Sequence, residues 1–168
     1  ACFEFLNRNN DILVFDDNFS IKNKKHIKYF FSPNRIKKIN FDYIFLSPGI
    51  DINNCILSKF LKKNKIKIIS ELDIFYKTYP NLNKITITGT NGKSTTSKLI
   101  YEVLKYHKKD VRLVGNIGNP ILEEKNITKN TIFVIEASSY QIDYSKYFET
   151  NIALILNIAP DHLERHKT

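Results

Sequence analysis

The stretch KITITGTNGKSTTSKLIYEVL, from Lys84 to Leu104, constrains the fold more than any other part of the chain. It begins with an apolar run rich in β-branched residues, breaks at two glycines, and continues with apolar residues at helical spacing. This order predicts a strand that ends at Thr88, a tight loop, and a helix from about Lys93 to His107. Such a succession is typical of an α/β fold with a largely parallel sheet.

The loop between this strand and helix has the composition of a phosphate-binding loop. Glycine allows the backbone to approach anions closely, and the loop amides and the helix N-terminus carry positive partial charge. A lysine here reaches the β- and γ-phosphates, and the following hydroxyl suits magnesium. Because the strict motif has another glycine where this chain has Ile87, the spacing G-x-x-G-K-S is a shortened variant. The predicted triphosphate-binding residues are Gly89, Thr90, Asn91, Gly92, Lys93, Ser94 and Thr95.

Polar residues also follow other buried strands, at the sheet edge where parallel sheets bind ligands. Glu136 comes directly after IFVI and is a candidate magnesium ligand. His162 follows IALIL, where it can bind metal or contact a substrate. Neutral hydrogen-bonding side chains accompany them, namely Asn116, Ser138 and Gln141. Each has an ordinary alternative, as a loop residue, a helix-start acid or a surface histidine.

The sequence before residue 80 predicts a separate α/β unit. It has expected strands at 12–15, 43–46 and 66–69, and expected helices over NNCILSKFLKKN and SELDIFYKTY, the latter capped by Ser70. Asp16 ends the first of these strands, and the turn Ser47–Pro48–Gly49 ends the second. At these places a Rossmann-type domain contacts a nucleotide. The strand and glycine-rich turn that open such a domain are missing.

The sequence after residue 80 predicts a second unit, and the asparagines and proline of YPNLN suggest a linker. Its expected strands span 85–88, 111–114, 131–135 and 152–156. We therefore expect two domains, 1–80 and 81–168, each incomplete at its outer end.

Composition excludes several classes. The net charge of +9 comes mostly from lysines scattered among Ile and Asn, with no nucleic-acid-binding motif, so we expect no nucleic-acid partner. No apolar run is long enough to cross a membrane. The two cysteines, Cys2 and Cys55, lack metal-ligand spacing. We expect a cytoplasmic monomer.

Together these stretches resemble the Mur ligases, the ATP-dependent amide-forming enzymes of cell-wall synthesis. TGTNGKST is similar to the ATP loop of the family. The segments LSPGI, ISELDIF, GNIGNP, EASSYQ and LNIAPDHLERH resemble, in order and spacing, the branch that adds D-glutamate.

The resemblance implies a chemistry and assigns residues to it. ATP would phosphorylate the terminal carboxylate of UDP-N-acetylmuramoyl-L-alanine, and D-glutamate would then displace the phosphate. Lys93 would contact the phosphates, and Ser94 and Glu136 would ligate Mg²⁺. His162 would ligate a second Mg²⁺ or lie against the muramoyl substrate. The UDP-sugar would be contacted by Asp16, Ser47, Pro48, Gly49, Asn116, Ser138 and Gln141.

Relative to the family, the chain starts after the first glycine-rich turn and stops before the magnesium-binding lysine and the C-terminal domain. We therefore expect an internal piece of a longer enzyme, inactive by itself. A non-catalytic nucleotide-binding remnant and a sister ligase with another amino acid remain alternatives. A GTPase or kinase is least favoured, because no base-reading or switch motif follows the loop.

Overall fold

The computed structural model describes residues 2–16 and 31–163. Within them, the contacts divide the chain into two compact units, residues 1–68 and 69–168, and each is described by itself. No helix in the described ranges is both long and apolar enough to span a membrane.

The first unit is built from short elements. Its helices are α1 (Cys2–Leu6), α2 (Pro33–Ile36) and α3 (Ser58–Lys63), followed by the 3₁₀ turn η3 (Lys65–Lys67). The strands β1 (Ile44–Phe45) and β2 (Ile68–Ile69) pair in a two-stranded sheet.

One expectation for this unit is met only in part: the strand predicted at 66–69 is limited to β2, because residues 65–67 form the 3₁₀ turn η3. Two others need correction. The strand predicted at 12–15 is wrong, because only Val14 makes a bridge there, and its carbonyl accepts the Phe31 amide at 2.9 Å. The helix predicted over 53–64 begins later, at Ser58, because Asp51 and Asn53 form an Asx turn instead, with Asn53 N donating to Asp51 Oδ1 at 2.8 Å. An apolar run alone did not determine either backbone path.

The second unit contains a fully parallel four-stranded sheet in the order β4-β5-β3-β6. The strands and helices predicted after residue 69 are confirmed within one or two residues. The strands are β3 (Asn83–Thr88), β4 (Val111–Gly115), β5 (Ile132–Glu136) and β6 (Ile152–Ile155), and the other elements are α4 (Glu71–Thr78), α5 (Lys93–Tyr106), η4 (Ile121–Glu123) and α6 (Ser139–Asp143).

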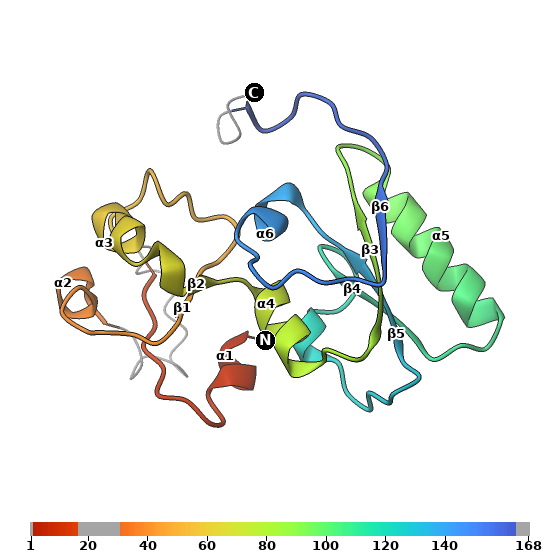
Figure 1. Cartoon of the computed structure of the whole chain (residues 1–168), viewed down its shortest axis with the longest axis horizontal. Helices are drawn as coiled ribbons and strands as arrows, with labels where there is room; N and C mark the ends of the chain where they lie inside the picture. The colour runs from red at the N-terminus through yellow and green to blue at the C-terminus, as the bar shows by residue number, and fades with distance from the viewer. Residues whose placement is uncertain (1, 17–30, 164–168) are drawn as a thin grey trace. The chain divides into compact units, whose positions relative to one another are not determined.

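Helices cover both faces of this sheet. Successive strand residues point to opposite faces, so Phe133 and Val134 of β5 face different layers. Val134 lies in the core cluster that includes Ile100 of α5, and Figure 1 shows α5 lying along the strands. The Phe133 ring lies 4.8 Å from that of Phe75 in α4, between centroids. The expected α/β architecture with a parallel sheet is confirmed for this unit.

Asp73 takes part in the capping box of α4, as the sequence predicted, and it also binds a segment that is distant in the sequence. It forms the capping box with Ser70, and its other carboxylate oxygen, Oδ1, accepts hydrogen bonds from Ser145 Oγ, Lys146 N and Tyr147 N, each at 2.8 Å. Burial of Asp73 raises its pKa, but these hydrogen bonds to the carboxylate outweigh it and leave the pKa below the usual value of 3.8. One buried acid therefore ties α4 to the chain after α6.

We expect Asp73→Asn to lower the free energy of unfolding by about 2 kcal/mol, because an amide cannot accept all these bonds. The pKa of Asp73 is lower in the folded protein than its ordinary value of 3.8. Its contribution to the free energy of unfolding is therefore fully present above pH 3.8 and is lost as the pH falls through the folded pKa. Denaturant titrations at neutral and acidic pH measure both effects. Asp51→Asn, which affects one exposed bond, is the control; equal losses in the two variants would contradict the prediction.

Candidate functional site

The loop between β3 and α5 turns at two glycines with positive φ, 139° at Gly89 and 84° at Gly92. Gly92 caps α5 in the left-handed conformation, which favours glycine. A Cβ at Gly89 would lie 3.1 Å from the Asn157 carbonyl oxygen. Both glycines predicted for this loop are therefore required by its backbone.

Lys93 folds back over the loop. Its ammonium donates to the Gly89 carbonyl at 2.6 Å and to the Thr90 carbonyl at 2.8 Å. A positive charge is thereby held at the loop, next to the N-terminus of a helix of 14 residues. This arrangement favours an anion at the same place.

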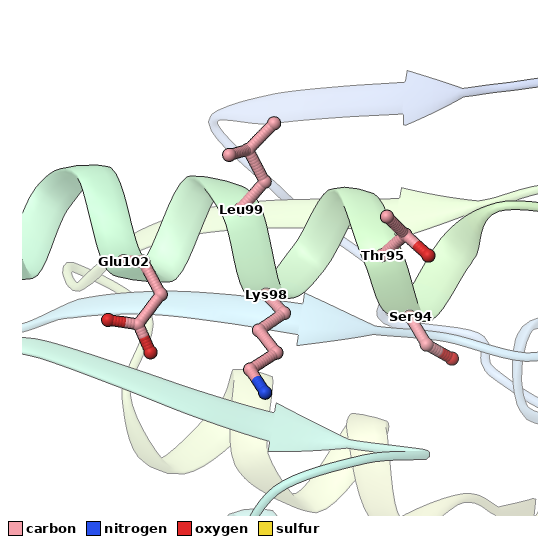
Figure 2. Close-up of a pocket in the computed structure, with 5 residues that line it drawn as sticks. All are labelled: Ser94, Thr95, Lys98, Leu99 and Glu102. Atoms are coloured by element: carbon pink, nitrogen blue, oxygen red, sulfur yellow. The ribbon is translucent and has the colours of Figure 1, made fainter.

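Ser94 and Thr95 lie in the first turn of α5 and are exposed. Figure 2 shows them at the end of the helix toward which the strand arrows point, which is the carboxyl edge of the sheet. A shallow hollow starts at these two residues and continues along the helix past Lys98, Leu99 and Glu102. The sequence analysis did not anticipate this hollow, because nothing in the local pattern distinguishes its residues from an ordinary exposed helix face.

Glu136 ends β5 and is 1% exposed. In the sheet it is paired with Ile87 on one side and Gly115 on the other, so it lies between the strand that leads into the loop and β4. Asn116 Nδ2 donates to Glu136 Oε1 at 3.1 Å, whereas Oε2 is buried without a hydrogen-bond partner in the described part of the chain. An uncompensated buried carboxylate oxygen fits a cation ligand.

Gly115 allows the close approach of β4 to this acid. Its φ is 102°, and a Cβ there would lie 2.3 Å from the Glu136 carbonyl oxygen, which accepts the Asn116 amide at 2.9 Å. Asn116 is therefore fixed to Glu136 by both its backbone and its side chain. The structure brings these two predicted site residues together.

Ser138 and Gln141 form a capping box at the start of α6. Ser138 N donates to Gln141 Oε1 at 2.9 Å, and Gln141 N donates to Ser138 Oγ at 3.3 Å. Both side chains thus have a structural task just after Glu136. The S-x-x-Q motif is the sequence signal of such a capping box, whereas the sequence-based prediction assigns these two residues to substrate contact only.

His162 lies beyond β6 with a φ of 52°. Its backbone amide donates to Asp161 Oδ1 at 2.9 Å, and its ring lies 4.8 Å from that of Tyr140, between centroids. The side chain is about half exposed. Residues 164–166, the end of the PDHLERH motif, and the two residues after them lie outside the described residues.

Among residues 2–16 and 31–163, no three His, Cys, Asp or Glu side chains are grouped as a metal site. A Mg²⁺ ion at Glu136 would therefore need hydroxyl, phosphate or water oxygens as its other ligands, which is its usual preference. The Ser94 hydroxyl and the phosphates of a bound nucleotide have the required chemistry.

Asn157 is a site residue that the sequence prediction missed, although it follows an apolar strand at the ligand edge, the signal used for the others. The prediction that this strand is buried is wrong, because three of the four residues of β6 are exposed. Its side chain makes two hydrogen bonds with the backbone of Asn91, each of 2.9 Å. Its carbonyl oxygen accepts the Thr90 amide at 3.1 Å. Asn157 thus contacts the loop between β3 and α5, the candidate phosphate loop, at three points.

The predicted UDP-sugar residues Asp16, Ser47, Pro48 and Gly49 lie in the first unit. The Ser47 carbonyl accepts the Ile50 amide at 3.0 Å, which closes a turn. No atom lies within 4 Å of the position of a Cβ at Gly49, so this turn faces open space. Asp16 is half-buried at the end of the first described range.

Fold and site together define an α/β protein whose glycine loop, lysine, serine and buried acid gather at the carboxyl edge of a parallel sheet. Residues 87–168 match the family described as Mur ligase middle domain. This part of the chain is therefore similar to the Mur ligases, in agreement with the resemblance in the sequence.

Relatives extend this match over nearly the whole chain. UDP-N-acetylmuramoylalanine–D-glutamate ligase of Rickettsia bellii is 40% identical, covering 99% of this chain and 37% of the relative. The enzyme of the same name from Caldicellulosiruptor bescii is 43% identical over 74% of this chain and 27% of the relative. The match thus spans 37% of the length of the first relative and 27% of the length of the second.

A solved structure shares the fold at low identity. The crystal structure of UDP-N-acetylmuramate:L-alanyl-gamma-D-glutamyl-meso-diaminopimelate ligase from Neisseria meningitides aligns with a TM-score of 0.52 and 13% identity. The alignment covers 90% of this chain and 54% of that one.

Proposed function

We propose that this chain belongs to an ATP-dependent ligase that joins D-glutamate to UDP-N-acetylmuramoyl-L-alanine in the cytoplasm, for peptidoglycan synthesis. One observation carries the proposal: a carboxylate oxygen of Glu136 is buried without a hydrogen-bond partner among residues 2–16 and 31–163, one strand away from a loop that holds a lysine against its own carbonyls. Relatives named for this activity, at about 40% identity, support the choice of substrates.

In this proposal residues 89–95 form a P-loop-type site for ATP. Lys93 and the backbone amides of the loop offset the negative charge of the phosphates, which otherwise opposes the approach of a carboxylate. Ser94 and Glu136 hold Mg²⁺, with His162 near a second ion or the muramoyl group. Bound Mg²⁺ supplies charge neutralisation at the phosphate oxygens.

The chain's other candidate residues orient the second substrate. Asn116 fixes Glu136 Oε1 and leaves Oε2 for the metal. Ser138 and Gln141 set the direction of α6 through their capping box and lie near the reacting end of the UDP-sugar. Asp16 and the Ser47–Pro48–Gly49 turn contact its uracil and diphosphate, within a Rossmann-like domain of residues 1–80.

The reaction then needs little proton transfer in its first half. The alanine carboxylate attacks the γ-phosphorus of ATP, a carboxyl oxygen–phosphorus bond forms, and ADP leaves. The amine of D-glutamate then attacks the acyl carbon, loses a proton and releases phosphate. Residues 81–168 contribute positioning and electrostatic stabilisation to the first half.

The test is ADP release by the native polypeptide that carries this sequence, with ATP, Mg²⁺ and UDP-N-acetylmuramoyl-L-alanine. We expect release that depends on D-glutamate, and none with L-alanine or meso-diaminopimelate. Dependence on another amino acid would identify a sister ligase instead. Nucleotide binding without any amino-acid-dependent release would identify a non-catalytic module.

A further inference from the structure

We propose that Asn157 is a positioning residue that turns the donors of the phosphate loop toward the nucleotide. The inference rests on the proposed function, because it assigns a task within the ATP site. It comes from the geometry of a residue that lies 66 positions from its partner Asn91 and has no role in the chemistry described above.

The side chain of Asn157 fixes two consecutive peptide planes. Its Oδ1 accepts the Asn91 amide, which belongs to the peptide between residues 90 and 91. Its Nδ2 donates to the Asn91 carbonyl, which belongs to the peptide between residues 91 and 92. Both bonds are 2.9 Å long, so one amide side chain clamps the turn from both ends.

Because the peptide group is planar and trans, these two hydrogen bonds also fix the direction of the groups on the opposite side of the loop. The carbonyl and the amide of one peptide point in opposite directions. Since the Asn91 amide points at Asn157, the Thr90 carbonyl points away, and there it accepts Lys93 Nζ at 2.8 Å. Since the Asn91 carbonyl also points at Asn157, the Gly92 amide points away as well. The clamp therefore directs the Gly92 amide to the side of the loop that carries the lysine.

A second pair of hydrogen bonds holds the loop in the same conformation. The Thr90 hydroxyl donates to the Ala159 carbonyl at 3.1 Å and accepts the Ala159 amide at 3.0 Å. The loop is thus joined to the segment that leads from β6 to His162. The segment that follows β6 therefore helps to hold the loop in its conformation through these hydrogen bonds.

The chain offers a matched control at the other end of the same strand pair. Asn151, just before β6, accepts the Lys84 amide on its Oδ1 at 2.8 Å. Both asparagines are exposed and join the β6 side to the β3 side through side chain–backbone bonds. Asn151 lies at the edge of the sheet opposite to the loop. A purely structural role predicts similar effects of substituting either residue.

The experiment compares Asn157→Ala, Asn157→Asp and Asn151→Ala in the native polypeptide. We expect Asn157→Ala to raise the KM for ATP at least about tenfold, with the KM for the UDP-sugar within twofold, because misplaced donors act on the phosphates alone. Asn157→Asp keeps the acceptor for the Asn91 amide and loses the donor to the Asn91 carbonyl. We therefore expect its KM for ATP to lie between those of the wild type and Asn157→Ala. Asn151→Ala keeps the wild-type KM for ATP.

An unchanged KM for ATP in Asn157→Ala would overturn the inference, as would equal changes in Asn157→Ala and Asn151→Ala. Hydrogen exchange at the Asn91 amide, measured without ATP, tests the clamp separately. We expect the Asn91 amide to exchange faster in Asn157→Ala but not in Asn151→Ala. A wild-type exchange rate in Asn157→Ala would also overturn the inference. A wild-type protein that shows this clamp but neither binds nor turns over ATP would refute the proposed function and, with it, the task assigned to the clamp.

Discussion

Replacing Lys93 with alanine is expected to lower ATP-dependent turnover by about 10³-fold. The ammonium lies within 2.8 Å of two loop carbonyls, so it is already held at the loop when the site contains no nucleotide. It is the one side-chain cation in the 89–95 segment. Its removal leaves the loop amides and the proposed Mg²⁺ to offset the negative charge of the transferred phosphate without a lysine. Steady-state kinetics of ADP release measures the loss.

Two further variants distinguish the effect of the positive charge from the effect of its position at Lys93. Lys93→Arg keeps the charge but replaces a compact ammonium with a planar group, and we expect it to recover only part of the turnover. Lys105→Ala, in the last turn of the same helix, changes the net charge equally and serves as the control. Turnover above a tenth of wild type in Lys93→Ala would show that the lysine does not act on the phosphates.

Glu136→Gln is expected to reduce turnover about 10²-fold and to raise the Mg²⁺ concentration needed for half-maximal rate. The substitution is close to isosteric, so Asn116 keeps an acceptor, whereas the buried Oε2 is replaced by an amide nitrogen that cannot bind a cation. A magnesium titration of the rate distinguishes lost metal binding from lost folding.

The unfolding behaviour of this variant gives an independent check. A buried carboxylate oxygen that has no hydrogen-bond partner within the described residues, as Glu136 Oε2, is destabilising, so Glu136→Gln is expected to be at least as stable as wild type in the absence of metal. Glu123→Gln, an exposed acid at the end of η4, is the control for the change in charge. A Glu136→Gln protein with wild-type magnesium dependence would exclude this residue as a ligand.

Much of the second unit follows from local sequence. The strand before the loop, the helix after it and the Ser70–Asp73 capping box were predicted within one or two residues, because each depends on residues near in sequence. In the first unit the same signals failed at 12–15 and at the start of α3. There, apolar runs are short and pairing with distant segments decides whether a strand forms.

The sequence by itself therefore indicated the candidate residues for binding phosphate and metal: a glycine loop with Lys93 and Ser94, and an acid at a strand end. Only the tertiary structure decided how they are arranged. The order β4-β5-β3-β6 places Glu136 beside the strand that enters the loop and Asn157 against the loop itself. The reason is physical: propensity and periodicity act over a few residues, whereas strand order depends on which distant segments bury their faces together.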